Sequence, residues 1–176
     1  NVIDYATNGM RTEFLDIYLG AHCTFCVSNS NGFDAVPRIF KRPLLICDEA
    51  IYFESSHLAL HTVHYPKIIR EQSNESQLSL RETINRGIAN SHQSANFEDA
   101  GVEIRDLSSE ELVEAVTEMA QRVEGTFVET PEQKEMQAKL KHILSTHPKL
   151  QPTPNYYPIR AEFASCFLSR YPHFLD

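Results

Sequence analysis

The sequence predicts an α/β fold in which helices flank a parallel sheet. Three observations support this prediction. First, strand-like runs alternate with helical patterns over the first half of the chain. Second, the apolar runs at 23–28 and 43–47 contain no charged residue, as expected of parallel strands buried on both faces. Third, the chain has 176 residues, of which 41% are hydrophobic and 23% are charged, which suits one folded domain with its own core.

The first half of the chain contains three predicted strands separated by two predicted helices. The strands are expected at 2–6, 23–28 and 43–47. The helices are expected at 11–20, where the apolar residues share one face and Gly20 is the natural stop, and at 33–40. This β-α-β-α-β order implies parallel strands joined by right-handed crossovers.

Three helices of the second half begin with recognisable caps. Ser79, Ser108 and Thr130 each stand three residues before a Glu or Gln, which is the spacing of a capping box. The helices are expected at 79–90, 109–124 and 130–145. A polar loop is expected at 91–99 and a fourth strand at 102–105.

Two stretches are less regular. Residues 48–78 show no clear periodicity, and residues 148–158 are rich in proline. We interpret the second stretch as a connector between a domain over 1–147 and a last helix over 159–171. The segment 148–176 is expected to pack on the same domain as a helical C-terminal flank.

Charge and hydropathy argue against several classes of function. The chain carries 16 Lys and Arg against 24 Asp and Glu, a net charge of −8, which argues against nucleic-acid binding. It contains no apolar run long enough for a membrane span and no basic, apolar start typical of a signal peptide, so we expect a cytoplasmic protein. Because a strand-like run follows Asn1 at once, we expect the chain to be a fragment of a longer protein.

The pair Cys23 and Cys26 has the C-x-x-C spacing found in redox and zinc sites. Both residues fall in a predicted strand, where positions three apart point to opposite faces. No second C-x-x-C completes a zinc site. We therefore interpret these cysteines as small core residues in a reducing compartment.

The polar loop at 28–32 is the strongest candidate for a binding site. Loops at the carboxyl ends of parallel strands line the ligand crevice of open α/β sheets. Gly32 would let the backbone approach a ligand, and the next helix would point free N–H groups at an anion such as a diphosphate. The loop adds four short polar side chains: Ser28, Asn29, Ser30 and Asn31. In the absence of a ligand, the same residues would serve as ordinary helix caps.

Two acidic residues follow the next strand. Asp48 and Glu49 come directly after 43–47, so we expect them at the same edge of the sheet. There they would either hydrogen-bond the hydroxyl groups of a ribose or sugar or cap a turn.

Three histidines form the pattern that most suggests a metal. His57, His61 and His64 would line one face of a helix, and imidazole is a good zinc ligand. However, no H-E-x-x-H motif is present, and apolar residues between the histidines favour packing. We therefore expect no metal ion.

Short motifs along nearly the whole chain carry a resemblance to a known family. They are Ile3-Asp4-Tyr5, Asp16-Ile17-Tyr18-Leu19, Cys23-x-Phe25, Gly32, Pro66-Lys67, the helices beginning at Ser79 and Ser109, and the closing segments 160–163 and 171–175. With these motifs the sequence resembles the C-terminal half of bacterial glycosyltransferases of GT-B type, a family encoded in surface-polysaccharide gene clusters.

The resemblance implies a Rossmann-like domain over 1–147 that binds a nucleotide-sugar. In the family, the loop after the second strand binds the donor's diphosphate, which corresponds to residues 28–32 here, with Asn31 in place of the more usual Ser. Lys67 is a candidate cation for the negative charge that develops on the leaving diphosphate. Enzymes of GT-B type need no metal-binding D-x-D motif, and the sequence contains none. We expect no metal and no cofactor besides the donor.

The resemblance also implies a partner domain. GT-B enzymes place the acceptor and the catalytic base in an N-terminal domain, which we expect to lie outside this chain. The chain alone would then be an incomplete catalyst, and its catalytic residues stay unknown. Two alternatives remain open. A sugar-nucleotide epimerase has the same fold but requires a general acid and base that the sequence does not place. A non-catalytic module would bind a protein through the acidic helices at 110–141.

Overall fold

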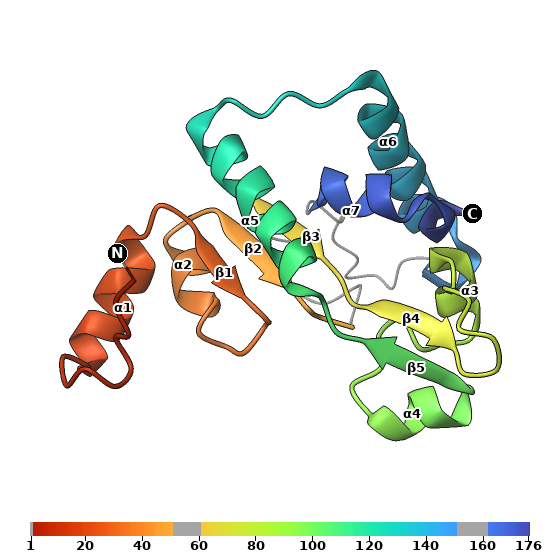
Figure 1. The fold of residues 1–176 in the computed structure, drawn as a ribbon, viewed down its shortest axis with the longest axis horizontal. Helices are drawn as coiled ribbons and strands as arrows, with labels where there is room; N and C mark the ends of the chain where they lie inside the picture. The colour runs from red at the N-terminus through yellow and green to blue at the C-terminus, as the bar shows by residue number, and fades with distance from the viewer. Residues whose placement is uncertain (1, 51–60, 151–161) are drawn as a thin grey trace.

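The computed structural model describes residues 2–50, 61–150 and 162–176 (Figure 1). Four parallel strands form the main sheet in the order β1-β2-β3-β6. They are β1 (Cys26–Ser28), β2 (Leu44–Cys47), β3 (Thr62–Tyr65) and β6 (Glu162–Phe163). A second, antiparallel sheet consists of β4 (Ile68–Glu71) and β5 (Val102–Arg105). Helices flank the parallel sheet, so the predicted Rossmann-like α/β architecture is confirmed.

The helices range from single turns to four turns. They are α1 (Glu13–His22), α2 (Ala35–Ile39), α3 (Leu80–Asn85), α4 (Ser94–Asp99), α5 (Ser109–Glu124), α6 (Pro131–Thr146) and α7 (Ser165–Arg170). Short 3-10 helices cover Pro148–Leu150 and Pro172–Leu175. All three predicted capping boxes are present, because Ser79, Ser108 and Thr130 accept the N3 amide while the N3 side chain accepts the cap amide. None of the described helices has the length and apolar character of a membrane span.

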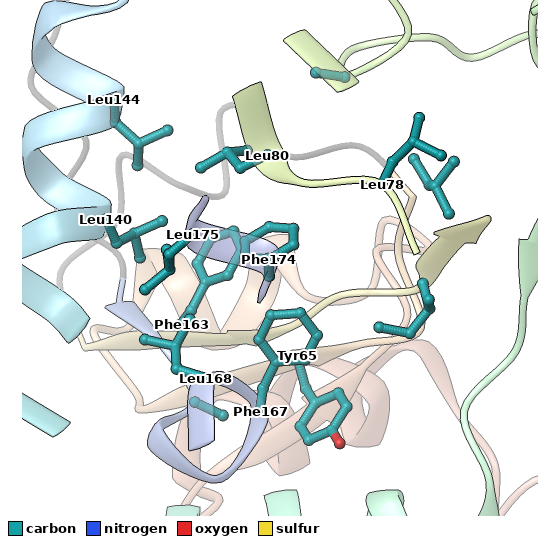
Figure 2. Close-up of a cluster of buried hydrophobic side chains, with 14 of the residues drawn as sticks. Tyr65, Leu78, Leu80, Leu140, Leu144, Phe163, Phe167, Leu168, Phe174 and Leu175 are labelled. Atoms are coloured by element: carbon teal, nitrogen blue, oxygen red, sulfur yellow. The ribbon is translucent and has the colours of Figure 1, made fainter. Parts of the chain in front are cut away.

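The core lies between the parallel sheet and the helices of the second half. Every residue of β2 is buried, and α7 contacts both α5 and α6. Four aromatic rings fill the centre, as Figure 2 shows: Tyr65, Phe163, Phe167 and Phe174. The ring centroids of Tyr65 and Phe167 lie 5.2 Å apart in an edge-to-face arrangement, which is a favourable geometry for aromatic pairs.

The closing segment contributes to the sheet as well as to the core. Residues 162–163 form β6 beside β3, and α7 and the last 3-10 helix bury Phe167, Leu168, Phe174 and Leu175. The predicted helix at 159–171 is therefore wrong at its start, since the helix begins at Ser165; residues 159–161 lie outside the described residues. A two-residue strand is too short to leave a periodic pattern in a sequence.

Two predictions at the N-terminus are wrong. Residues 2–6 form no strand; Tyr5 N–H bonds to the carbonyl of Ile3 in a turn. Gly20 does not stop the first helix, because α1 continues to His22. Gly20 instead lies against Val36, where an added Cβ would lie 2.7 Å from Val36 Cγ1. The glycine thus serves the packing of α1 on α2.

Other boundaries and pairings also differ from the predictions. β1 begins at Cys26, and its central Val27 is 43% exposed, so this strand is not buried on both faces. The irregular stretch 48–78 contains β3 and β4, and the predicted loop 91–99 contains α4. The helix after Ser79 ends at Asn85, shortly before Gly87, whose φ is 75°. β5 matches its predicted range but pairs antiparallel with β4, outside the parallel sheet.

The four cysteines are free thiols. Cys23 and Cys26, expected in the core, are only partly buried, and Cys23 lies just beyond α1 rather than in a strand. Burial, with smaller effects of Cys23 and Asp34, raises the pKa of the Cys26 thiol to about 11, which makes it a poor nucleophile at neutral pH.

Candidate functional site

The parallel register brings the predicted site residues to one edge of the sheet. Ser28, the last residue of β1, pairs with Ile46, and Cys47, the last residue of β2, pairs with Tyr65, the last residue of β3. The segments that leave these strands are the loop at 28–32, the pair Asp48 and Glu49, and Pro66-Lys67. All eight predicted site residues therefore belong to the carboxyl edge of the sheet, where open α/β folds bind ligands.

Side chains of the loop and of Asp34 already accept hydrogen bonds from backbone N–H groups of the loop. Ser28 Oγ accepts the N–H of Ser30 at 3.1 Å, and Asn31 Oδ1 accepts the N–H of Phe33 at 3.2 Å. The N–H of Gly32 donates to Asp34 Oδ1 at 3.0 Å. The expectation that the amides after Gly32 are free is thus wrong for Phe33, since the loop caps itself. An anion at this loop would have to displace these side-chain acceptors.

Asp34 is the residue of this loop that the sequence analysis missed. Its side chain is buried and pairs with Arg38 four residues later, so a carboxylate lies where an anion was expected. Ser30 has a φ of 64° and Gly32 a φ of 90°, so the loop contains two left-handed positions. α2 has only five residues, which gives its dipole little strength. An Asp two residues after Gly is a signal for such capping that the sequence does contain.

Lys67 lies between two carboxylates at this edge. Its Nζ is 3.5 Å from Asp48 Oδ2 and 2.5 Å from Asp106 Oδ1, while its backbone N–H donates to the carbonyl of Glu49. Burial alone would lower the pKa of Lys67, but the two Asp residues outweigh it and raise the pKa. Lys67 is therefore a firmly charged cation. Asp106 was not predicted, although it directly follows the predicted strand 102–105.

Asp48 joins the two sheets. Its Oδ1 accepts the backbone N–H of Leu107 at 3.0 Å, and its backbone N–H donates to the carbonyl of Tyr65. The residue has a φ of 61°, an uncommon left-handed conformation that Asp tolerates better than most residues. Asp48 thus fixes the end of β5 next to the ends of β2 and β3, and with it the position of Asp106.

A partly buried charge network, centred on the buried Glu111, lies next to this edge. Arg105, at the end of β5, forms a two-pronged pair with Glu111 of α5 at 2.7 and 2.9 Å, and Tyr171 donates to the same carboxylate. Burial would raise the pKa of Glu111, but the hydrogen bonds from Arg105, Tyr171 and Ser108 hold it well below the usual range. No pattern in the sequence pointed to this network.

The histidines do not form the helical face that was considered. His61 directly precedes the extended strand β3, His64 lies within it, and His57 lies outside the described residues. His64 is buried with its Nδ1 3.8 Å from Glu49 Oε2, whereas His61 is exposed. Across residues 2–50, 61–150 and 162–176, no group of three or more His, Cys, Asp or Glu side chains is placed to hold a metal ion.

A cavity of about 450 Å³ lies at the opposite end of the strands. Its lining includes Pro43 and Thr62, at the start of β2 and β3, together with Arg122 of α5 and Glu162 of β6. The predicted site and this cavity are therefore separate features. Arg122 also contacts Glu118 and Glu162 at 2.8 and 2.9 Å, so its charge is largely balanced.

Comparison of the chain with protein-family models, with curated proteins and with solved structures found no match.

Proposed function

We propose that this chain is the donor-binding half of a GT-B type glycosyltransferase that acts in polysaccharide or glycoconjugate synthesis. The observation that supports this most is the convergence of three segments at the carboxyl edge of the parallel sheet: the loop at 28–32, the acidic pair Asp48 and Glu49, and Lys67. Nucleotide ligands of open α/β sheets bind at this edge. The nucleotide-sugar is the substrate, and the proposal involves no metal.

In this proposal, residues of different charge bind different parts of the donor. Lys67 supplies the positive charge that a diphosphate requires, and Asp106, whose side chain is 77% exposed, is the partner it would release on binding. Asp48 and Glu49 carry acceptors suited to the hydroxyl groups of a ribose or sugar. Ser28, Asn29, Ser30 and Asn31 supply short polar groups. Binding at Gly32 and Phe33 requires the side chains of Asp34 and Asn31 to leave their present hydrogen bonds.

The acceptor and the catalytic base come, in this proposal, from an N-terminal partner domain. The residues at the edge bind and orient the donor and stabilise the charge of the leaving diphosphate. Chain 1–176 alone should accordingly bind a nucleotide-sugar without transferring its sugar.

The proposal is tested by thermal unfolding with a panel of uridine, guanosine and cytidine nucleotides and their sugar conjugates. A ligand at a hundred times its Kd should add about 2.7 kcal/mol to the free energy of unfolding. Lys67→Met should abolish most of this gain. Lys139→Met is the matched control, because Lys139 is exposed on α6 and, among the described residues, pairs only with Asp176. No stabilisation by any member of the panel would contradict donor binding and favour a non-catalytic module.

If a nucleotide or nucleotide-sugar of the panel stabilises the chain, a sugar-nucleotide epimerase must still be distinguished from a glycosyltransferase. Analysis of the sugar released or isomerised by the full-length protein makes this separation: a transferase moves the sugar to an acceptor, whereas an epimerase returns an isomeric nucleotide-sugar.

A further inference from the structure

The cavity at the amino end of the strands is lined by charged and by apolar side chains. Its volume of about 450 Å³ falls within the range of about 300–1,000 Å³ that small-ligand pockets usually have. The apolar lining comes from the first residues of β2 and β3 and from α5: Pro43, Val63, Met119 and Val123. The charged lining includes Arg122 of α5 and Glu162 of β6. The donor site proposed at the carboxyl edge uses none of these residues, so the cavity needs a separate explanation.

The guanidinium of Arg122 is held in a fixed orientation. Its Nε donates to Glu118 Oε1 at 2.8 Å, and its Nη2 lies 3.8 Å from Glu129 Oε1. The guanidinium also lies over the ring of Phe127, with its Cζ 4.3 Å from the ring centroid. The remaining nitrogen, Nη1, donates to Glu162 Oε2 at 2.9 Å. Of these three carboxylates, Glu162 is the one that lines the cavity, so the contact of Nη1 with Glu162 is where a ligand would meet Arg122.

The pair of Arg122 and Glu162 is accessible to a dissolved molecule. The two side chains are 19% and 33% exposed, and Glu162 Oε1 also lies 3.5 Å from Nζ of the exposed Lys141. A partly exposed ion pair adds little to stability, because water screens both charges. A ligand can therefore open the contact between Nη1 and Oε2 at a small cost, while Glu118 and Lys141 stay beside the two charges.

The two lining charges indicate what kind of ligand fits between them. A ligand with only one charge replaces one ion pair by another and leaves the second lining group without a partner in the cavity, which is unfavourable. A zwitterion pairs with both groups through charge-assisted hydrogen bonds. Because Nη1 of Arg122 and Oε2 of Glu162 are in direct contact, the two ligand charges must lie close together. An α-amino acid meets this condition, since its carboxylate and ammonium are attached to the same carbon atom.

We propose that the cavity binds a free α-amino acid with an apolar side chain. The carboxylate of the ligand pairs with Arg122 and its ammonium pairs with Glu162, while its side chain contacts the apolar lining at Met119 and Val123. An apolar side chain gains free energy when this lining removes it from water. The cavity shares no residue with the donor site, so each of the two proposals can fail without the other.

The methionines provide the readout for a test, because Met119 lines the cavity whereas Met10 is exposed before α1. NMR spectra of chain 1–176 with isotope-labelled methionine methyl groups are recorded during a titration with leucine. We expect millimolar leucine to shift the Met119 signal saturably and to leave the Met10 signal unchanged. Two further probes keep the side chain of leucine but lose one charge each: isocaproate lacks the ammonium and isoamylamine lacks the carboxylate. Each should bind more weakly than leucine by about tenfold or more, because one charge-assisted contact is lost.

Substitutions locate the site. Glu162→Gln should weaken the binding of leucine by about tenfold but should not weaken that of isocaproate, which has no ammonium to pair with Glu162. Val123→Phe should abolish the leucine-induced shift by filling the cavity, whereas Val113→Phe, at an exposed position of the same helix, should keep it. Absence of a Met119 shift with leucine in the wild-type chain overturns the proposal, whatever the variants do. A response to isocaproate or isoamylamine as strong as that to leucine, or a leucine-induced shift that persists in Val123→Phe, overturns it as well.

Discussion

The two ends of this chain form regions of opposite character. In the second half of the chain, the helices α5, α6 and α7 with β6 contribute buried apolar residues to one aromatic core, and Arg122 of α5 pairs with Glu118 and Glu162. Between Val2 and Phe40, most apolar side chains are exposed, and α1 contacts little besides α2. Both regions have amphipathic or apolar helices, so helix formation alone does not bury them. The difference lies in whether a packing partner is present.

The largest expected effect separates the two regions directly. Phe167→Ala should cost about 3–5 kcal/mol of unfolding free energy, because the ring is fully buried and packs against four other aromatic rings. Phe14→Ala should change it by less than about 0.5 kcal/mol, because Phe14 is exposed. Urea unfolding of both variants measures the difference. Equal losses would show that α1 belongs to the core.

The second prediction concerns the charge network behind the candidate site. Glu111→Gln should destabilise the protein by about 3 kcal/mol at neutral pH, because it leaves Arg105 without its buried partner. The folded-state pKa of Glu111 is depressed, so its contribution is present above the ordinary Glu pKa of about 4.3 and is lost as the pH falls toward the folded value. The difference in unfolding free energy between wild type and Glu111→Gln should therefore become smaller at acid pH. A gap that is independent of pH down to about pH 2 would contradict this assignment.

A third substitution tests the contact that holds α1 to α2. Alanine favours a helix over glycine by about 1 kcal/mol. At Gly20, however, the new Cβ would lie 2.7 Å from Val36 Cγ1, and overpacking costs about 1–3 kcal/mol. We expect Gly20→Ala to be destabilising by about 1 kcal/mol, and Val36→Ala to relieve the clash in the double variant. Thermal unfolding of the two single variants and the double variant gives a double-mutant cycle. If Gly20→Ala stabilises the protein, α1 is only loosely held against α2.

The smallest effect is expected at the exposed apolar surface near α2. Ile39→Ser should leave the free energy of unfolding within about 0.5 kcal/mol of wild type, because the side chain is 75% exposed. Urea unfolding of the variant beside wild type measures the change. A loss above about 1.5 kcal/mol would place Ile39 in a packed interface of the isolated chain.

The candidate site was predictable in position but not in its contacts. The order of strands and loops was enough to place Ser28–Gly32 and Asp48 at one edge, because parallel strands end on the same side. Lys67 follows β3, which was not predicted within the irregular stretch 48–78, so only the structure brought it to this edge. Asp106 reaches Lys67 across 39 positions of the chain, and Asp34 occupies the amide of Gly32. The contact of Asp106 depends on where β5 is placed, which no local spacing reveals, whereas the contact of Asp34 is local and was overlooked.

The sequence by itself determined the features that depend on near neighbours: the capping boxes at Ser79, Ser108 and Thr130, the buried run of β2 and the parallel α/β class. Only the tertiary structure determined that residues 162–163 form β6, that β4 pairs antiparallel with β5, and that residues 2–6 form no strand. The physical reason is common to all three. A capped helix satisfies its own backbone, whereas a strand exists only when another strand accepts its hydrogen bonds, and that partner can come from anywhere in the chain or from outside it.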